Sequence, residues 1–196
     1  MTMQVKKNRS GVKAAAVVAT GLVASALVIW FSSYAAFTAT TTNSGNSFSS
    51  GSVAISDDDS NGVLFSVSGL KPGDTGSKCI EVTYNGSVAS SVKLYTTAAS
   101  YTGTLGTYLD FTVKQGTGGT YADCTGFVAD SGGTIHNGTL AAFASSYTNF
   151  ANGIGTWTPS TAGTKKTFQF TYTLQDNNSA QNKSAGIGFT WEAQSS

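Results

Sequence analysis

The sequence predicts an all-β domain, an antiparallel β-sandwich of jelly-roll type with one short helix. Three observations lead to this prediction. Apolar and aromatic residues come in short bursts and alternate with Ser and Thr, as in strands that bury one face. Turn residues separate the bursts at short intervals, as in sandwiches and barrels. One segment alone has apolar residues at helical spacing.

Alternating apolar residues predict eight strands between Gly51 and the C-terminus. They cover residues 52–55, 63–67, 79–84, 88–97, 109–113, 121–128, 167–175 and 185–191. Leu140, Phe143, Tyr147 and Phe150 recur at intervals of three and four and predict a short helix within Thr139–Phe150. Thr139 is its candidate N-cap.

The N-terminus predicts a secretory signal peptide over residues 1–36. An uncharged apolar run, residues 14–31, follows a basic start and ends in small residues. The basic residues are Lys6, Lys7, Arg9 and Lys13. Cleavage is expected after Ala35 or Ala36, with a retained membrane anchor as the alternative, because the run approaches the length of a spanning helix.

The remaining chain, residues 37–196, has the length of one domain and carries seven Lys, no Arg and ten acidic residues, a net charge of −3. Nucleic-acid binding depends on Lys and Arg that neutralise phosphates, so this function class is excluded. A secreted, extracellular location is expected.

The chain has two cysteines, Cys79 and Cys124. In an exported protein such a pair predicts a disulfide that closes a long loop, and two buried free thiols are the alternative. A zinc or redox role is not expected, because there is no Cys-x-x-Cys motif and His136 is the only histidine.

The one charged cluster with the spacing of metal ligands is residues 57–62. Asp57, Asp59 and Asn61 match positions 1, 3 and 5 of a calcium loop, and Gly62 matches position 6. Position 12 is Ser68 rather than Glu, which excludes an EF-hand. A looser Ca²⁺ loop and a solvated acidic turn remain as alternatives, and no other cofactor is expected.

Four places in the chain resemble the TasA/camelysin family of exported matrix proteins, whose leaders are processed by a SipW-type signal peptidase. They are Ala35-Ala36-Phe37 with Asn46–Val53, Gly69–Asp74 with Lys78, Tyr84–Ser87, and Gln181–Ser184 with Phe189–Gln194. The resemblance implies a jelly-roll subunit that polymerises outside the cell into fibres of a biofilm matrix or a pilus-like filament.

In such fibres the released N-terminal segment is expected to lie in a groove of the next subunit as a donated strand. Residues 37–50 predict a flexible arm whose backbone has no evident partner in its own domain, and Phe37 and Phe48 are the candidate anchors. A head-to-tail contact of this kind propagates a filament. The alternative is a disordered tail or an edge strand of the chain's own sheet.

The resemblance also raises a metalloprotease, as camelysin-type members have been described. A zinc protease needs two His one helical turn apart with a Glu, whereas His136 is alone in a predicted loop, residues 132–138. We therefore expect no enzyme. The remaining alternative is a monomeric adhesion or carbohydrate-binding domain, with Tyr101, Tyr108, Tyr121 and Tyr147 on a sugar-binding face. The expected partners are copies of the chain and a signal peptidase, with membrane contact only through the uncleaved leader.

Overall fold

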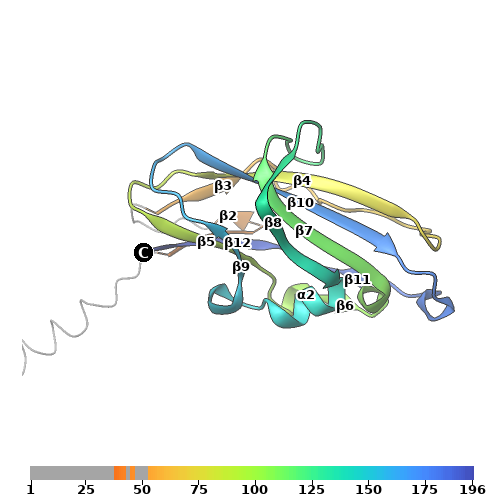
Figure 1. The fold of residues 1–196 in the computed structure, drawn as a ribbon. Coiled ribbons are helices and arrows are strands. Elements are labelled where there is room, and N and C mark those ends of the chain that lie inside the picture. The colour runs from red at the N-terminus through yellow and green to blue at the C-terminus, as the bar shows by residue number, and fades with distance from the viewer. Residues whose placement is uncertain (1–37, 43–44, 47–52) are drawn as a thin grey trace, which may run out of the picture. The chain divides into compact units, whose positions relative to one another are not determined.

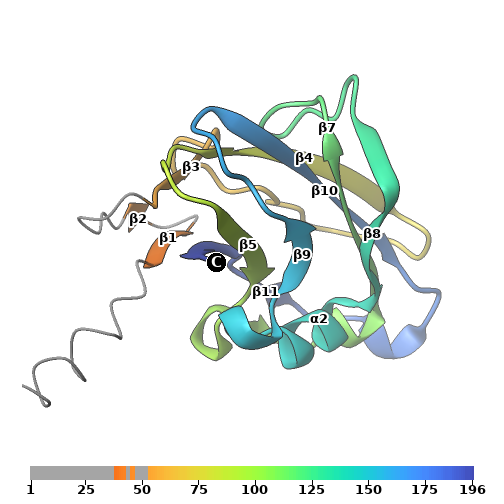
Figure 2. The same cartoon turned by 60° about the vertical axis from the view of Figure 1, so that its left-hand side comes forward.

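The computed structural model describes residues 38–42, 45–46 and 53–196, so the predicted signal peptide and both candidate anchors, Phe37 and Phe48, lie outside the described residues. Two five-stranded antiparallel sheets face each other (Figures 1 and 2). The first has the order β2 (Gly45–Asn46), β1 (Thr38–Thr42), β12 (Thr190–Ser195), β5 (Ser90–Tyr95), β9 (Ile154–Trp157). The second has the order β3 (Ile55–Asp57), β4 (Thr75–Tyr84), β10 (Thr164–Leu174), β7 (Leu109–Thr117), β8 (Val128–Thr139).

The strand pairing is that of a jelly roll. If the short strands β2 and β3 are set aside, the sandwich contains four nested antiparallel pairs: β1 with β12, β4 with β10, β5 with β9, and β7 with β8. The first long strand thus pairs with the last, the second with the last but one, and so on inward. The predicted all-β jelly-roll sandwich is confirmed.

The core lies between the two sheets and is built from the alternating residues of the predicted strands. Ile80, Val82 and Tyr84 of β4 are buried, as are the equivalent residues of the other central strands. These are Val92, Leu94, Leu109, Phe111, Val113, Phe168, Phe170 and Leu174. The ring centroids of Phe170 and Phe189 lie 4.5 Å apart in a stacked arrangement, which adds to the stabilisation from burial alone.

The predicted helix is present but shorter than its apolar spacing suggests. Helix α2 covers Leu140–Ser146, and the Thr139 side chain caps it by accepting a hydrogen bond of 3.1 Å from the Ala142 N–H. The helix buries Leu140 and Phe143, and Phe150 lies beyond it in a separate 3₁₀ turn. No helix within the described residues is long and apolar enough to cross a membrane.

Short elements complete the fold. A two-stranded sheet pairs β6 with β11, and the described residues contain four 3₁₀ turns in the connections. Their bounds are β6 Thr102–Gly103, β11 Ala185–Gly186, η1 Ala98–Ser100, η2 Leu105–Tyr108, η3 Phe150–Asn152 and η4 Asn178–Ala180.

Residues 63–67, predicted as a strand, form no strand in the structure. The buried residue of this segment is Leu64, while the exposed fractions of Val63 and Val67 are 72% and 50%. The alternation was correct as a pattern, but the segment is a connection that turns one leucine toward the core. Phe65 is half-buried and also packs against the core, with its ring centroid 5.4 Å from that of Tyr172, so the segment contacts the core through these two residues and not through a strand face.

Three further predictions need correction near the ends of strands. Residues 121–127 form turns, and the strand begins only at Val128. Residues 132–138, predicted as a loop, belong to β8, which pairs with β7 across two register shifts. The predicted closing strand, residues 185–191, is split between β11 and β12, because Ala185 pairs with Gly103 whereas Thr190 pairs with Tyr95.

Candidate functional site

The first strand of the described chain completes a sheet in its own domain. Five residue pairs join β1 to β12, from Thr38 with Gln194 to Thr42 with Thr190. The sequence predicted an arm without a partner there, and for residues 38–42 the structure instead shows an edge strand of the chain's own sheet. On the opposite side, in the part of the chain that the structure describes, β1 pairs with the two-residue strand β2.

The strand that receives β1 has one apolar and one polar face. Trp191 and Ala193 are fully buried in the core, and Glu192, opposite Thr40, is also buried. The Glu192 carboxylate accepts hydrogen bonds from the Tyr95 hydroxyl and from the Gln194 side chain. Sequence reasoning missed this carboxylate, because one Glu in a Thr-rich strand reads as a solvent-facing residue.

The acidic turn after β3 is attached to the rest of the sandwich through Asp58. One carboxylate oxygen of Asp58 accepts a hydrogen bond of 2.9 Å from the Glu81 N–H, and the other accepts one of 2.6 Å from the Tyr121 N–H. Asp58 therefore joins the turn to β4 and to the 118–127 connection. The predicted calcium loop included Asp57 and Asp59 as ligands and did not include Asp58.

Of the predicted ligands, Asp57 is the last residue of β3, and Asp59 and Asn61 lie in the turn that follows. Asp59 is 4% exposed, and its Oδ1 accepts a hydrogen bond of 2.7 Å from the Asn61 N–H. Burial, followed by a hydrogen-bonding contact with Asp57 and the charges of Asp57 and Asp58, raises the pKa of Asp59 to about 6, although the bond from Asn61 lowers it. Among the described residues, no three His, Cys, Asp or Glu side chains are placed to hold one metal ion.

A disulfide joins Cys79 of β4 to Cys124 in the 118–127 connection, with 5.1 Å between the two Cα atoms. Next to it, the Ala122 N–H donates a hydrogen bond to the Cys79 carbonyl. The covalent bond, this hydrogen bond and the Asp58 carboxylate together hold the connection against β4. Cys79 is fully buried, although the predicted strand placed it opposite the core-facing Ile80.

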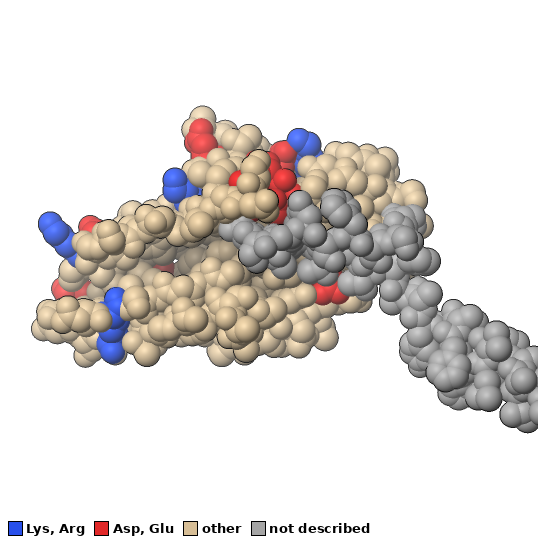
Figure 3. All heavy atoms as spheres, turned by 180° about the vertical axis from the view of Figure 1, so that it is seen from behind, with Lys and Arg blue, Asp and Glu red and all other residues tan. Residues whose placement is uncertain are grey.

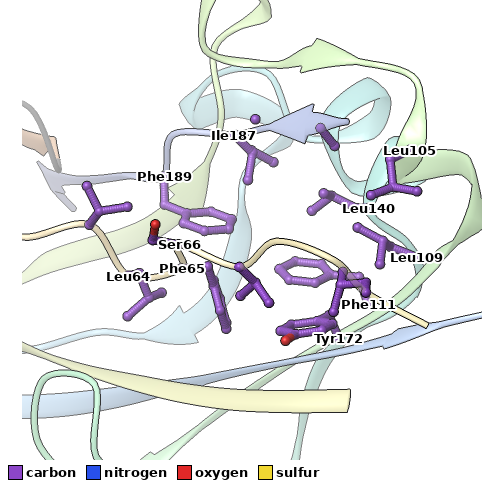
Figure 4. Close-up of a pocket in the computed structure, with 15 residues that line it drawn as sticks. Leu64, Phe65, Ser66, Leu105, Leu109, Phe111, Leu140, Tyr172, Ile187 and Phe189 are labelled. Carbon is purple, nitrogen blue, oxygen red and sulfur yellow. The ribbon is translucent and has the colours of Figure 1, made fainter. Parts of the chain in front are cut away.

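An apolar pocket of about 380 Å³ opens between the sheets near α2. Its lining comes from the 63–70 connection, from β7 and β10, from α2 and from the segment before β12; Figure 4 shows the labelled side chains converging on it. The main contributors are Leu64, Phe65, Leu109, Phe111, Leu140, Tyr172, Ile187 and Phe189. Because most of the side chains that line it are apolar, the pocket suits an apolar side chain or ligand.

His136 is buried, contrary to the predicted solvated loop residue. It is 8% exposed and lies among aromatic rings, with its ring centroid 5.3 Å from that of Phe143 and 5.6 Å from that of Tyr147. Burial lowers the pKa of His136, outweighing the opposite effect of its 3.3 Å contact with the Thr139 carbonyl. This environment makes His136 a packing residue beneath α2.

The tyrosines, the charged side chains and a second pocket are the remaining surface features, and they do not form one site. The four tyrosines considered for sugar binding do not share one strand, since Tyr147 packs on His136 while the Tyr121 backbone bonds to Asp58. On the face drawn in Figure 3, charged side chains of the described residues are few, and most of the surface is uncharged. The second pocket lies at the β9 edge and is polar, with Gln115, Asp130 and Lys166 in its lining.

Together these features define a disulfide-linked jelly-roll domain whose first strand completes the edge of a sheet. The chain belongs to the camelysin metallo-endopeptidase family, whose model matches residues 5–105. This confirms the resemblance to the TasA/camelysin family, although the C-terminal motif at residues 181–194 lies outside the match. A comparison with curated proteins found no matching relative.

Proposed function

We propose that the chain is exported, cleaved after Ala35 or Ala36, and assembled outside the cell into fibres as a structural subunit. The observation that carries this proposal is the pairing of β1 with β12. Strand pairing is made by backbone groups, so the β1 of a second copy would make the same five residue pairs with this β12. Exchange of the first strand then links one subunit to the next.

The topology allows β1 to leave its sheet without breaking the other strand pairs. Strand β1 is the outermost long strand of its sheet and the first of the nested pairs, so its release leaves the other three pairs intact. The stretch between β1 and β3 is rich in Ser, Asn and Gly, a composition typical of linkers. A donated first strand gives a head-to-tail contact that does not close, and such contacts extend into filaments.

Phe37 and Phe48 are proposed as the anchors of the donated segment. The apolar pocket, at about 380 Å³, exceeds the roughly 150 Å³ cavity that admits a benzene molecule. It is therefore large enough for a phenylalanine side chain, but its Phe189 lies next to the Thr42–Thr190 pair, whereas Phe37 precedes the Thr38–Gln194 pair at the other end of β12. An anchoring side chain would add apolar burial to the backbone bonds of the exchanged strand, wherever on the acceptor it is received.

The first test is a deletion of residues 37–48 in the mature protein, examined by negative-stain electron microscopy. We expect the deletion to abolish fibres that the intact mature chain forms. Undiminished fibres in the deletion variant would end the strand-exchange proposal, and an intact chain that stays monomeric at high concentration would end the structural role itself.

A second test places a cross-link at the Thr38–Gln194 pair. Directly opposed residues of antiparallel strands lie about 4.5–5.5 Å apart at Cα, within reach of a disulfide. Fibres grown from a mixture of the single variants Thr38→Cys and Gln194→Cys should yield oxidised dimers. A mixture of Thr38→Cys with Asp176→Cys, at an exposed site in the loop after β10, is the control. Equal dimer yields in both mixtures would contradict the exchange.

The family's description names a metallo-endopeptidase, so that activity is the second candidate. We propose that this chain is not an enzyme, because its single histidine is packed among aromatic rings under α2. A casein-cleavage assay of the mature protein, with and without a zinc chelator, tests this. Cleavage that the chelator abolishes would establish the protease.

A further inference from the structure

Residues 63–67 have the alternation of a strand, but their backbone pairs with no other strand of the described chain. No backbone hydrogen bond joins residues 63–70 to another described residue. Two valines of this segment are exposed, Val63 by 72% and Val67 by 50%. Unpaired backbone groups beside exposed apolar side chains are the features by which a sheet edge receives an extended segment.

The same segment forms part of the wall of the apolar pocket. Leu64 and Phe65 line the pocket from this segment, and Ile187 and Phe189 line it from the stretch before β12 (Figure 4). None of the residues that line the pocket is charged. The site therefore suits an uncharged segment that carries one apolar side chain.

The register of β1 on β12 directs a donated strand toward this pocket. Thr42, the last residue of β1, lies opposite Thr190, and the residue before Thr190 is Phe189, which lines the pocket. A donated β1 in the same register would therefore leave β12 beside the pocket. Its next residues would continue along the stretch that precedes β12.

Phe48 is the apolar residue that such an arm would bring to the pocket. It is the only large apolar residue between Thr42 and Val53, and it follows Thr42 by six residues. Six extended residues span about 20 Å, enough to pass along the stretch before β12. Two residue pairs join β1 to β2 within one copy, and so short a hairpin is too weak to keep a donated arm folded back.

We propose that Phe48 of a neighbouring copy inserts into this pocket, and that Val63 and Val67 become buried against the same arm. This inference rests on the proposed strand exchange and names the acceptor site of one of its anchors. A second copy is the occupant because residues 43–52 are uncharged like the pocket, and because the pairing of β1 with β12 delivers them to its rim.

The first test compares two exposed valines in the mature chain. Val63→Ser changes the rim of the pocket, and Val128→Ser, at a 65% exposed position of β8, is the matched control. Val63→Ser should raise the protein concentration needed for fibres by roughly 5–10-fold, and Phe48→Ala by roughly 10–100-fold, because each loses apolar burial. Val128→Ser should leave this concentration unchanged. Equal melting temperatures of the two valine variants before assembly check that neither replacement has altered the fold.

A cross-link between copies locates the arm directly. The variant Ser49→Cys keeps Phe48 and places a thiol next to it. Fibres grown from a mixture of Ser49→Cys with Val63→Cys should give covalent dimers when treated with a short bis-maleimide. A mixture of Ser49→Cys with Val128→Cys is the control and should give none.

Equal assembly of the two valine variants, equal dimer yields in the two mixtures, or assembly of Phe48→Ala at the parental concentration would overturn this acceptor site. If the cross-link between Thr38→Cys and Gln194→Cys still forms in such fibres, the strand exchange stands and only the site of Phe48 is wrong. Fibres that give neither cross-link would contradict the strand exchange as well.

Discussion

The Tyr95 hydroxyl of β5 donates a hydrogen bond of 2.7 Å to Oε2 of Glu192 on β12, and each residue is only 8% exposed. The Gln194 side chain donates to the other carboxylate oxygen at 2.8 Å. Burial, followed by the hydrogen bond to Glu192, raises the pKa of Tyr95, so the phenol remains the donor. Because Glu192 lies opposite Thr40, this buried pair stabilises the strand to which β1 attaches.

Replacing Tyr95 by Phe should lower the free energy of unfolding by about 1–3 kcal/mol, because the buried carboxylate loses one of its two side-chain donors. Urea denaturation at pH 7 measures the loss. Tyr108→Phe is the matched control, since the Tyr108 ring lies under Lys183 and its hydroxyl is not part of this buried pair. Equal losses in the two variants would show that the hydrogen bond contributes nothing specific.

The stability of the domain should fall in mild acid because of His136. Burial holds its pKa below the ordinary value of 6.5, so below pH 6.5 the unfolded chain binds more protons than the folded one. The residues that face His136 are Phe111 of β7 and Phe143 and Tyr147 of the α2 segment, and none of them is an acid. The free energy of unfolding should therefore decrease as pH falls from 7 toward 5.

Asp59 acts in the opposite direction. Its pKa is raised to about 6 in the folded chain, so between pH 6 and 3.8 the folded state binds more protons and gains stability as pH falls. The histidine effect should therefore be measured in an Asp59→Asn background, where His136→Phe flattens the pH dependence of unfolding between 7 and 5. An identical slope with and without His136 would assign the acid sensitivity to other groups.

The disulfide should contribute strongly to stability, because it closes a loop with a sequence separation of 45 residues. The chain-entropy model gives roughly 4 kcal/mol for a loop of this length. The double variant Cys79→Ala, Cys124→Ala should therefore melt well below the parent chain under oxidising conditions. Adding a reductant to the parent should reproduce the effect, while the variant should not respond; a reductant-sensitive variant would contradict the assignment.

The parts of the fold that the sequence predicted are those where alternation coincides with pairing on both sides. Strands β4, β7 and β10 lie inside one sheet, so each predicted apolar face meets the core. The strand predictions are wrong where strand pairing depends on residues far away along the chain. The 63–67 segment alternates as well as any strand, yet it makes no ladder, and its buried residue is Leu64.

Strand β8 is the opposite case, a strand that forms although the sequence predicted a loop over much of it. Residues 128–139 are rich in Gly, Asp and Asn, which are depleted in strands, and no local pattern identifies them. They form a strand because they pair with the edge of β7. The pairing is irregular and contains two register shifts. His136 is buried for the same reason, because its position depends on α2 folding back over β8. The role of Asp58 could not be predicted from the sequence either, because its hydrogen-bond partners lie 23 and 63 residues away along the chain.

The N-cap of α2 was predicted from sequence, and its contribution can be isolated. Thr139 accepts a hydrogen bond from the Ala142 N–H, and the helix it starts carries Leu140 into the apolar pocket and Phe143 onto His136. Thr139→Ala should cost about 0.5–2 kcal/mol in the free energy of unfolding, whereas Thr139→Ser, which keeps the oxygen, should recover most of it. Amide hydrogen exchange at Ala142 should accelerate in the Ala variant alone. If Ser fails to restore protection, the methyl group of Thr139, and not its hydroxyl, holds the start of the helix.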